Sequence, residues 1–312
     1  MRIVSLLPSA TEILFALGLG DDVCGITHEC DFPAGARSKR VVVRSKLPRG
    51  LAPAEVDRLV SEYIGRGESL YAVDAEALLE IAPDIIVTQD LCHVCAASPG
   101  DLGAALGRLP RMPQVISLNP HTMTDVWRDI LTVGDAAGRG AEARLLVAQL
   151  EERVAAVERS VAGISRRPRV ACLEWLDPFY CGGHWVPEMV ARAGGQDVLG
   201  CLGKPSFRIT AEQILAAQPE VVFAMPCGYR ADQAAAEYSR MQFPDGWNEL
   251  PAVRDARVFA MNASGYFSRP GPRLADGIEI LSAVIHPALA TAPIPAGAIL
   301  RIAEMSHRAA VL

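Results

Sequence analysis

Residues 74–87 read DAEALLEIAPDIIV, and residues 210–223 read TAEQILAAQPEVVF. The second stretch repeats the first position by position: Ala75, Glu76, Leu79 and Pro83 recur as Ala211, Glu212, Leu215 and Pro219. Before each proline the apolar residues follow the helical period, and after it comes a short apolar run of the kind that buried strands use. Each stretch therefore predicts a helix followed by a strand, which is the unit of a parallel sheet with crossovers.

A weaker echo lies upstream of each copy. RIVSLL at 2–7 and RVACL at 169–173 both read as strands, and the helical segments after them lead to GDDVCG at 20–25 and GQDVLG at 195–200. Two copies of one α/β unit explain this pattern. The alternative is that α/β segments resemble one another through composition alone.

The composition is that of a globular protein with room for two domains. The chain has 312 residues, of which 50% are hydrophobic and 21% charged, and its formal net charge is −6. Acidic and basic residues are interspersed, so no basic stripe points to nucleic acid, and no apolar run is long enough to span a membrane. Nothing in the sequence signals oligomerisation, so we expect a monomer.

The N-terminal residues indicate in which cellular compartment the protein is expected. RIVSLL is too short for the apolar region of a signal peptide, and Pro8 follows it at once. The chain as written is therefore expected in the cytoplasm. A trimmed chain that had received a new methionine would look the same and would belong to the periplasm or another extracytoplasmic space.

Strand and helix patterns predict four segments. An N-terminal α/β lobe covers 1–121, a connecting long helix 122–163, a C-terminal α/β lobe 164–287, and a surface tail 288–312. Thr122 is the expected N-cap of the connecting helix, and the GRG at 138–140 is expected to kink or interrupt it. Strands are expected at 2–7, 23–27, 40–43, 84–88 and 114–118 in the first lobe, and at 169–173, 197–199, 220–224 and 257–261 in the second.

In parallel sheets, ligands bind beyond the carboxyl ends of the strands. The loops expected there hold an unusual share of thiols and imidazoles, which we take as candidate metal ligands: His28, Cys30, Cys92, Cys95, Cys181, His184 and Cys227. The Cys-x-x-Cys pair at 92 and 95 is compatible with a metal chelate, a redox pair or two buried structural residues. Cys24 and Cys172 lie in apolar strands and are expected in the core.

The same loops are rich in aromatic residues. Candidate ligand contacts are Trp175, Tyr180, Trp185, Tyr229, Tyr266 and Phe267, with Arg269 as a cation able to meet a phosphate or carboxylate. These side chains either wall a broad apolar pocket or belong to the core. No nucleophile elbow, Walker loop or dinucleotide-binding glycine motif is present, so we expect no enzyme of those classes.

Four stretches together resemble a known family: RIVSLLPSATEILFALGLGDDVCGITHECDFP, PDIIVTQ, LEWLDPFYCGGHWVPE and YFSRPGPRLADGIEIL. They are similar to the cobalamin-binding branch of the class III substrate-binding proteins of ABC importers, over about residues 1–287. The resemblance implies two Rossmann-like lobes with parallel sheets joined by a long helix, and a ligand cleft between the lobes. It also implies that Glu76 and Glu212 dock onto an ABC permease, although both are also the first-turn acids that a helix dipole favours.

Three functions follow from these observations. The first is non-enzymatic binding of cobalamin or a related corrinoid, as a component of an ABC uptake system or a cytoplasmic relative of one, with His184 and Cys30 as candidate cobalt ligands. The second is binding of a soft metal ion such as zinc, or of another metal chelate, by the Cys and His residues. The third is a thiol-dependent enzyme that processes a bound corrinoid.

Overall fold

The computed structural model describes residues 1–48, 50–89 and 99–302. Within it the chain forms two compact units. Unit 1 consists of Met1–Pro120 and Thr124–Gln149, and unit 2 consists of His121–Met123 and the chain from Leu150 onward. The two compact units alternate along the chain, so they do not correspond to the consecutive segments expected from the sequence. The segment limits at residues 121, 163 and 287 remain predictions.

Unit 1 contains a six-stranded sheet in the order β4-β3-β2-β1-β5-β6. Neighbouring strands are parallel except β3 and β4, which are antiparallel. The strands are β1 (Ile3–Ser5), β2 (Val23–Thr27), β3 (Arg40–Ser45), β4 (Tyr71–Val73), β5 (Ile85–Gln89) and β6 (Gln114–Leu118).

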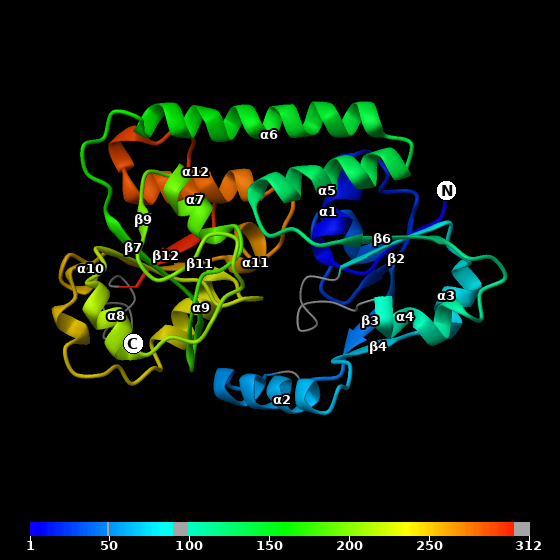
Figure 1. Ribbon diagram of the computed structural model, residues 1–312, viewed down its shortest axis with the longest axis horizontal. Helices are drawn as coiled ribbons and strands as arrows, with labels where there is room; N and C mark the ends of the chain where they lie inside the picture. Colours follow the sequence, from blue (N-terminus) through cyan, green and yellow to red (C-terminus); the bar gives the residue numbers. More distant parts are fainter. Residues whose placement is uncertain (49, 90–98, 303–312) are drawn as a thin grey trace. The chain divides into compact units, whose positions relative to one another are not determined.

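In Figure 1 the helices α1, α3, α4 and α5 are drawn around the strands of this sheet, and α2 is drawn further from them. Apolar residues of β1, β3 and β5 pack with residues of α2, α3 and α4 in one buried cluster. The helical segments are α1 (Pro8–Ala16), η1 (Ala34–Ser38), α2 (Pro53–Gly65), α3 (Ala75–Ile81), α4 (Pro99–Leu106) and α5 (Met123–Ala136).

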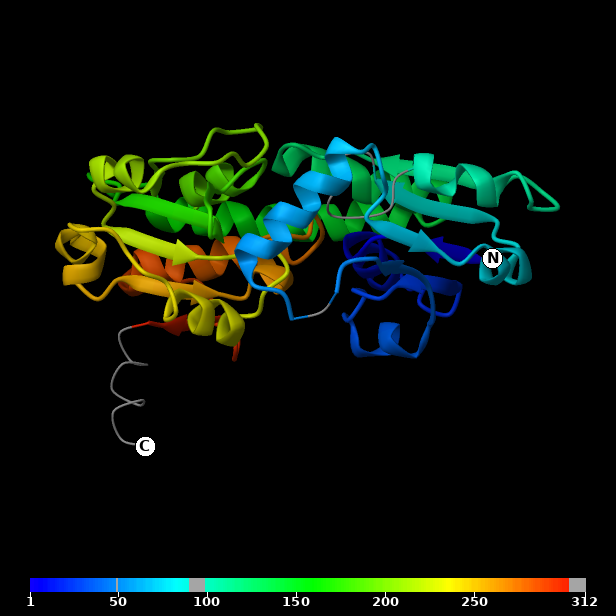
Figure 2. The same ribbon diagram turned by 90° about the horizontal axis from the view of Figure 1, so that it is seen from below.

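Unit 2 contains a second mixed sheet in the order β12-β11-β10-β7-β8, with β9 also paired to β7. Figure 2 shows β7, β10, β11 and β12 side by side in green, yellow, orange and red. The strands β8 and β12 run antiparallel to their neighbours, and the other pairs are parallel. The strands are β7 (Arg169–Leu176), β8 (Phe179–Cys181), β9 (Gln196–Asp197), β10 (Val221–Ala224), β11 (Val258–Met261) and β12 (Ile299–Arg301).

The helices of unit 2 include α7 (Val186–Arg192) and α12 (Leu274–Ile285), which pack on each other. In Figure 1 the long helix α6 (Gly140–Val161) runs along α12, and Arg153 joins the two by bonds to Asp276 and Glu279. The remaining helical segments are α8 (Ala211–Ala217), α9 (Ala231–Tyr238), η2 (Trp247–Glu249), α10 (Pro251–Arg254), α11 (Ala263–Tyr266) and η3 (Pro287–Leu289).

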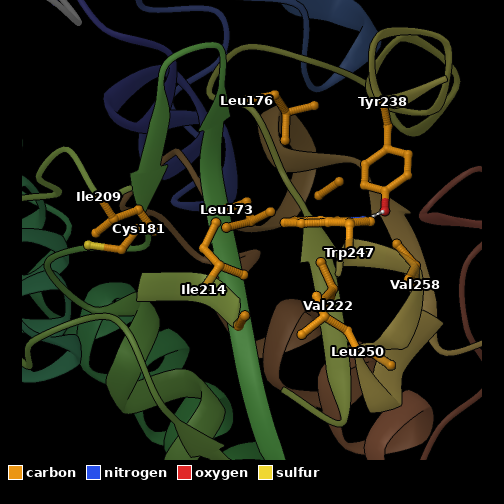
Figure 3. Packing of buried hydrophobic residues seen from close by; sticks show 13 residues of the cluster. Leu173, Leu176, Cys181, Ile209, Ile214, Val222, Tyr238, Trp247, Leu250 and Val258 are labelled. Carbon is orange, nitrogen blue, oxygen red and sulfur yellow. Dashed lines mark hydrogen bonds between the residues drawn. The ribbon is translucent and has the colours of Figure 1, made fainter. Parts of the chain in front are cut away.

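Trp247 is the centre of the hydrophobic core on the other side of this sheet (Figure 3). Its ring is 2% exposed and stacks on Phe179 at 5.7 Å and on Phe243 at 4.5 Å between ring centroids. Its Nε1–H donates to the hydroxyl of Tyr238 at 2.9 Å, so the one polar atom of the indole is satisfied.

The repeat read from the sequence is confirmed as a helix-to-strand unit in each sheet. The N-caps of α3 and α8 are Asp74 and Thr210, and each side chain accepts from the backbone N–H three residues on. Each helix ends at a residue in the left-handed region, Ala82 with φ of 44° and Gln218 with φ of 46°. The strands that follow, β5 and β10, lie inside their sheets.

The connecting segment differs from one long helix. It consists of α5 and α6, separated at Ala137–Arg139, where Gly138 adopts a φ of 69°. The predicted interruption at the GRG is therefore confirmed, because a left-handed residue ends a helix.

Three strands were not expected from the sequence: β4, β8 and β12. All three are three residues long and pair antiparallel, so the sheets are mixed rather than wholly parallel. The strand β12 also corrects the expectation of a surface tail from Ala288, because Ile299–Arg301 forms the edge of the second sheet.

Candidate functional site

The carboxyl ends of the strands in unit 2 are joined by a set of hydrogen bonds between loops. Glu174, near the end of β7, accepts the Gly183 N–H on its carboxylate at 3.0 Å and the Cys227 N–H on its carbonyl at 3.0 Å. The Ser264 N–H donates to the Tyr229 carbonyl at 3.2 Å. The strand β7 and the segments after β8, β10 and β11 are therefore one connected framework.

Trp175 and Tyr229 form an aromatic pair on this framework. Their rings meet edge to face with 5.8 Å between centroids, and both side chains are half-buried. The Trp175 Nε1–H donates to the Asp177 carbonyl at 3.1 Å, which fixes the indole. Burial raises the pKa of the Tyr229 phenol above its ordinary value, so the ring stays neutral at physiological pH. We call this pair the aromatic face.

Two further predicted contacts combine an aromatic ring with a cation. The Arg273 guanidinium lies 5.7 Å from the centroid of the Tyr266 ring. Arg208 donates from Nε to the Tyr180 hydroxyl at 3.0 Å and lies 5.7 Å from the same ring's centroid. Arg208 was not predicted from the sequence. Its position opposite β8 depends on the bridge between residues 180 and 208, which no local pattern reveals.

Trp185 and Phe267, two further candidate contacts, lie in the core, which is one of the two placements expected from the sequence. They are 4% and 1% exposed, and the Trp185 Nε1–H donates to the Phe267 carbonyl at 2.8 Å. They therefore brace the loops from inside the core. Arg269, two residues further on, is half-buried.

His184 lies beside a histidine that the sequence reading missed. The rings of His121 and His184 are 5.6 Å apart between centroids, and His184 also stacks on Trp185. Burial, with a smaller contribution from His121, lowers the pKa of His184, so its imidazole is neutral at physiological pH. His121 could have been identified as a candidate because it directly follows Asn119-Pro120, at the carboxyl end of β6.

The corresponding end of unit 1 carries a buried polar cluster. The Thr11 hydroxyl lies 2.8 Å from the Ser5 hydroxyl and 3.1 Å from the Cys30 sulfur, and the Thr27 hydroxyl lies 3.4 Å from that sulfur. Cys30 is 4% exposed. Its thiol therefore connects β2 to the helix after β1. His28 is half-buried, with Nε2 at 3.9 Å from the Glu29 carboxylate.

The described residues do not form a metal centre. No group of three or more His, Cys, Asp or Glu side chains within residues 1–48, 50–89 and 99–302 could hold a metal ion. Burial raises the pKa of the Cys181 thiol to about 11, which disfavours the thiolate that soft metals bind. Cys227 is half-buried beside the aromatic face. Cys92 and Cys95 lie outside the described residues.

Glu76 and Glu212 occupy equivalent exposed positions in the first turns of α3 and α8. Glu76 pairs with Arg108 at 2.6 Å. A hydrogen bond from the Thr210 side chain lowers the pKa of Glu212. Both residues lie where the dipole of their own helix favours an acidic side chain.

The described helices include none with the length and apolar content needed to cross a bilayer.

Comparison with curated proteins finds a vitamin B12-binding protein of Vibrio parahaemolyticus, 24% identical over 287 residues, covering 89% of this chain and 86% of the relative. An uncharacterized ABC transporter substrate-binding lipoprotein of Bacillus subtilis is 24% identical over 300 residues, covering 92% of this chain and 80% of the relative.

Solved structures share the fold. The periplasmic heme-binding protein RhuT from Roseiflexus sp. RS-1 superposes with a TM-score of 0.69 at 23% identity, covering 92% of this chain and 98% of the other. The periplasmic vitamin B12 binding protein BtuF of Vibrio cholerae gives a TM-score of 0.67 at 22% identity, covering 92% and 97%. The sequence profile named "Periplasmic binding protein" matches residues 3–264. The chain therefore belongs to the periplasmic binding protein family and is a class III substrate-binding protein of ABC importers.

Proposed function

We propose that this protein binds cobalamin or a related corrinoid without transforming it. The observation that carries the proposal is the aromatic face: two half-buried rings, Trp175 and Tyr229, set edge to face at the carboxyl ends of β7 and β10. Flat apolar ring surfaces suit a large macrocycle, and fixed polar groups around them suit its substituents. Relatives that cover most of the chain are named as vitamin B12-binding proteins, which supports the same ligand class.

Cationic side chains around the face suit a ligand that carries acidic groups. Arg273 lies over the Tyr266 ring, and Arg208 is held by the Tyr180 hydroxyl. Cobalamin has one phosphodiester, and heme has two carboxylates, so either would meet these cations. Cobinamide lacks the nucleotide loop and is the natural comparison.

The test is an absorbance titration of the reduced protein with cyanocobalamin, cobinamide and hemin, each recorded across its own visible bands. We expect saturable binding of a corrinoid at micromolar concentration or tighter. Saturable binding of hemin alone would assign the protein to heme instead. Failure of all three ligands would reject the proposal.

Two variants connect binding to the aromatic face. Trp175→Ala removes half of the aromatic pair, and we expect it to weaken corrinoid binding by roughly tenfold or more, the loss typical of a buried aromatic contact. Phe243→Leu is the matched control, because Phe243 is also a half-buried aromatic of unit 2 but packs on Trp247. Equal affinities in the two variants would count against the aromatic face as the binding surface.

Of the two cobalt ligands expected from the sequence, His184 and Cys30, we propose that only His184 approaches cobalt. The imidazole of His184 is neutral, which is the form that coordinates a metal. The Cys30 thiol is engaged by two threonine hydroxyls. His184→Ala should therefore change the spectrum of bound corrinoid, whereas Cys30→Ser should leave the spectrum unchanged.

We also propose that Glu76 and Glu212 dock onto the permease of an ABC importer. Their support is their equivalent placement in the repeated helices α3 and α8 and their exposure. An uptake role would require the protein to lie outside the cytoplasmic membrane. This is supported by the word "periplasmic" in the names of several similar structures and the word "lipoprotein" in the name of one relative. Replacing both residues by alanine should abolish uptake while leaving ligand affinity unchanged, and cell fractionation should find the protein in the extracytoplasmic fraction.

A further inference from the structure

The segment that leads from β6 into α5 belongs to a different compact unit from its neighbours. Residues His121–Met123 group with unit 2, whereas Pro120 and Thr124 belong to unit 1. Met123, the first residue of α5, is 1% exposed. We call residues 121–123 the crossover segment.

A carboxylate from α7 binds the crossover segment. The Met123 N–H donates to Oε2 of Glu188 at 3.0 Å, across 65 residues of sequence. The first N–H groups of a helix have no acceptor inside it, and a negative charge is favourable at that end. Glu188 therefore satisfies the start of α5 from another element.

The same glutamate is part of a chain of ion pairs. Its Oε1 accepts from Nε and Nη2 of Arg192 at 2.9 and 2.8 Å. Nη1 of Arg192 donates to Glu158 of α6 at 2.6 Å. The Glu188 side chain is 16% exposed, so solvent screens its contacts only weakly. The helix α7 thus holds both the crossover segment and α6.

The amino-terminal end of α7, whose first turn carries Glu188, borders the proposed ligand site. The residues just before the helix are Gly183, whose N–H donates to Glu174, and Trp185, whose indole donates to the Phe267 carbonyl. The carbonyl of Glu174 also accepts from Cys227, next to the aromatic face. A shift of this loop therefore moves the start of the helix that carries Glu188.

We propose that α7 couples the aromatic face to the crossover segment, with Glu188 as the positioning residue that transmits the coupling. Part of this inference rests on the proposed function, because the natural input is the bound ligand. The contacts themselves predict the coupling in the ligand-free protein as well.

The first test needs no ligand. Hydrogen exchange of the Met123 amide is measured by NMR in the wild type, Glu174→Ala, Glu188→Ala and the double variant. Loss of one hydrogen bond should speed exchange roughly tenfold in Glu188→Ala. Glu174→Ala should speed it severalfold when Glu188 is present and have no further effect when Glu188 is absent, which is the non-additivity of a coupled pair.

Two controls separate coupling from general loosening. Glu188→Gln keeps an oxygen acceptor for the Met123 N–H and should restore slow exchange. Glu279→Ala breaks an ion pair of α6 with α12 instead and should leave the Met123 amide unchanged. Unchanged exchange in Glu188→Ala, or equal and additive effects of the two substitutions, would overturn the inference.

The second test adds cyanocobalamin. Binding should slow exchange of the Met123 amide in the wild type and in Glu188→Gln but not in Glu188→Ala. Binding without any change at Met123 would refute the coupling while leaving the proposed function intact. Absence of binding would refute the proposed function, and the ligand-free experiment would still decide the coupling.

Discussion

Tyr238 shows how one side chain can serve both packing and hydrogen bonding. Its hydroxyl accepts from the buried indole of Trp247, and Figure 3 shows the bond inside the core. Tyr238→Phe leaves that N–H without its acceptor and should lower the free energy of unfolding by about 1–3 kcal/mol. Urea unfolding at pH 7 measures the loss, and equal stability would contradict it.

The same residue predicts a pH dependence. Burial raises the pKa of Tyr238 to about 12, whereas a tyrosine in the unfolded chain has an ordinary pKa of about 10. Above pH 10 the unfolded state releases its proton first, so the stability of the wild type should fall as pH rises through that range. Tyr238→Phe should lack this part of the alkaline decline in urea unfolding.

Asp129 of α5 predicts that stability also depends on pH between pH 4 and 7. Burial, and next the charge of Asp125, raise the pKa of Asp129 from 3.8 to about 7, and its Oδ2 has no hydrogen-bond partner among the described residues. Between pH 4 and 7 the unfolded state loses this proton first, so stability should fall as pH rises. Asp129→Asn should raise the free energy of unfolding at pH 8 by roughly 1–2 kcal/mol and leave it unchanged at pH 4.

At the scale of elements, α6 is fixed to α12 by one arginine. Arg153 bonds to Asp276 and Glu279, whose side chains are 28% and 16% exposed. Arg153→Ala leaves two neighbouring carboxylates without their cation and, because Arg153 itself is 38% exposed, should cost about 1–2 kcal/mol. Arg159→Ala, on the same helix, breaks an exposed pair with Glu152 and should cost less than about 0.5 kcal/mol in the same denaturation experiment.

The loop before α7 depends on a glycine. A Cβ at Gly183 would lie 2.2 Å from the Ser206 nitrogen, closer than any real contact. Gly183→Ala should therefore displace the loop, weaken corrinoid binding and lower the melting temperature. Gly65→Ala, which has open space around it at the end of α2, should leave both unchanged. Wild-type affinity in Gly183→Ala would show that the loop does not support the site.

The sequence predicted the elements whose signals are local. The strands β2 and β6 were located at their observed limits, and the repeated unit was identified because its helix period, proline and apolar run are all adjacent. The strands β4, β8 and β12 were missed because three residues carry too little periodicity to read. Glu188 could not be identified as the cap of α5, since its partner is 65 residues away.

The proposed site remains a prediction, and the structure shows how some of its predicted residues lie. Two of the predicted aromatic residues, Trp175 and Tyr229, are in contact. Trp175 and Tyr229 are half-buried, whereas Trp185 and Phe267, which were predicted from the same kind of aromatic-rich loop, lie in the core. Which aromatic faces outward depends on tertiary packing, and that information is absent from a loop's own residues.

For the whole molecule, interleaved units limit how the chain can be divided. Val126, Ile130 and Val133 of α5 are fully buried, and α5 belongs to unit 1 although it follows the crossover segment. A fragment of residues 1–120 lacks this helix and should show no cooperative thermal unfolding, whereas 1–149 should unfold cooperatively. Circular dichroism of both fragments checks this, and a cooperative transition in 1–120 would refute it.

The repeated helix and strand also indicate how the molecule arose. Both copies share a capped start, a left-handed final residue followed by proline, and a strand inside the sheet. This is what duplication within a single gene would leave behind. Because the shared unit sets only the scaffold, each descendant half could then acquire its own chemistry at the strand ends: buried hydroxyls and a thiol in one, aromatic rings and cations in the other.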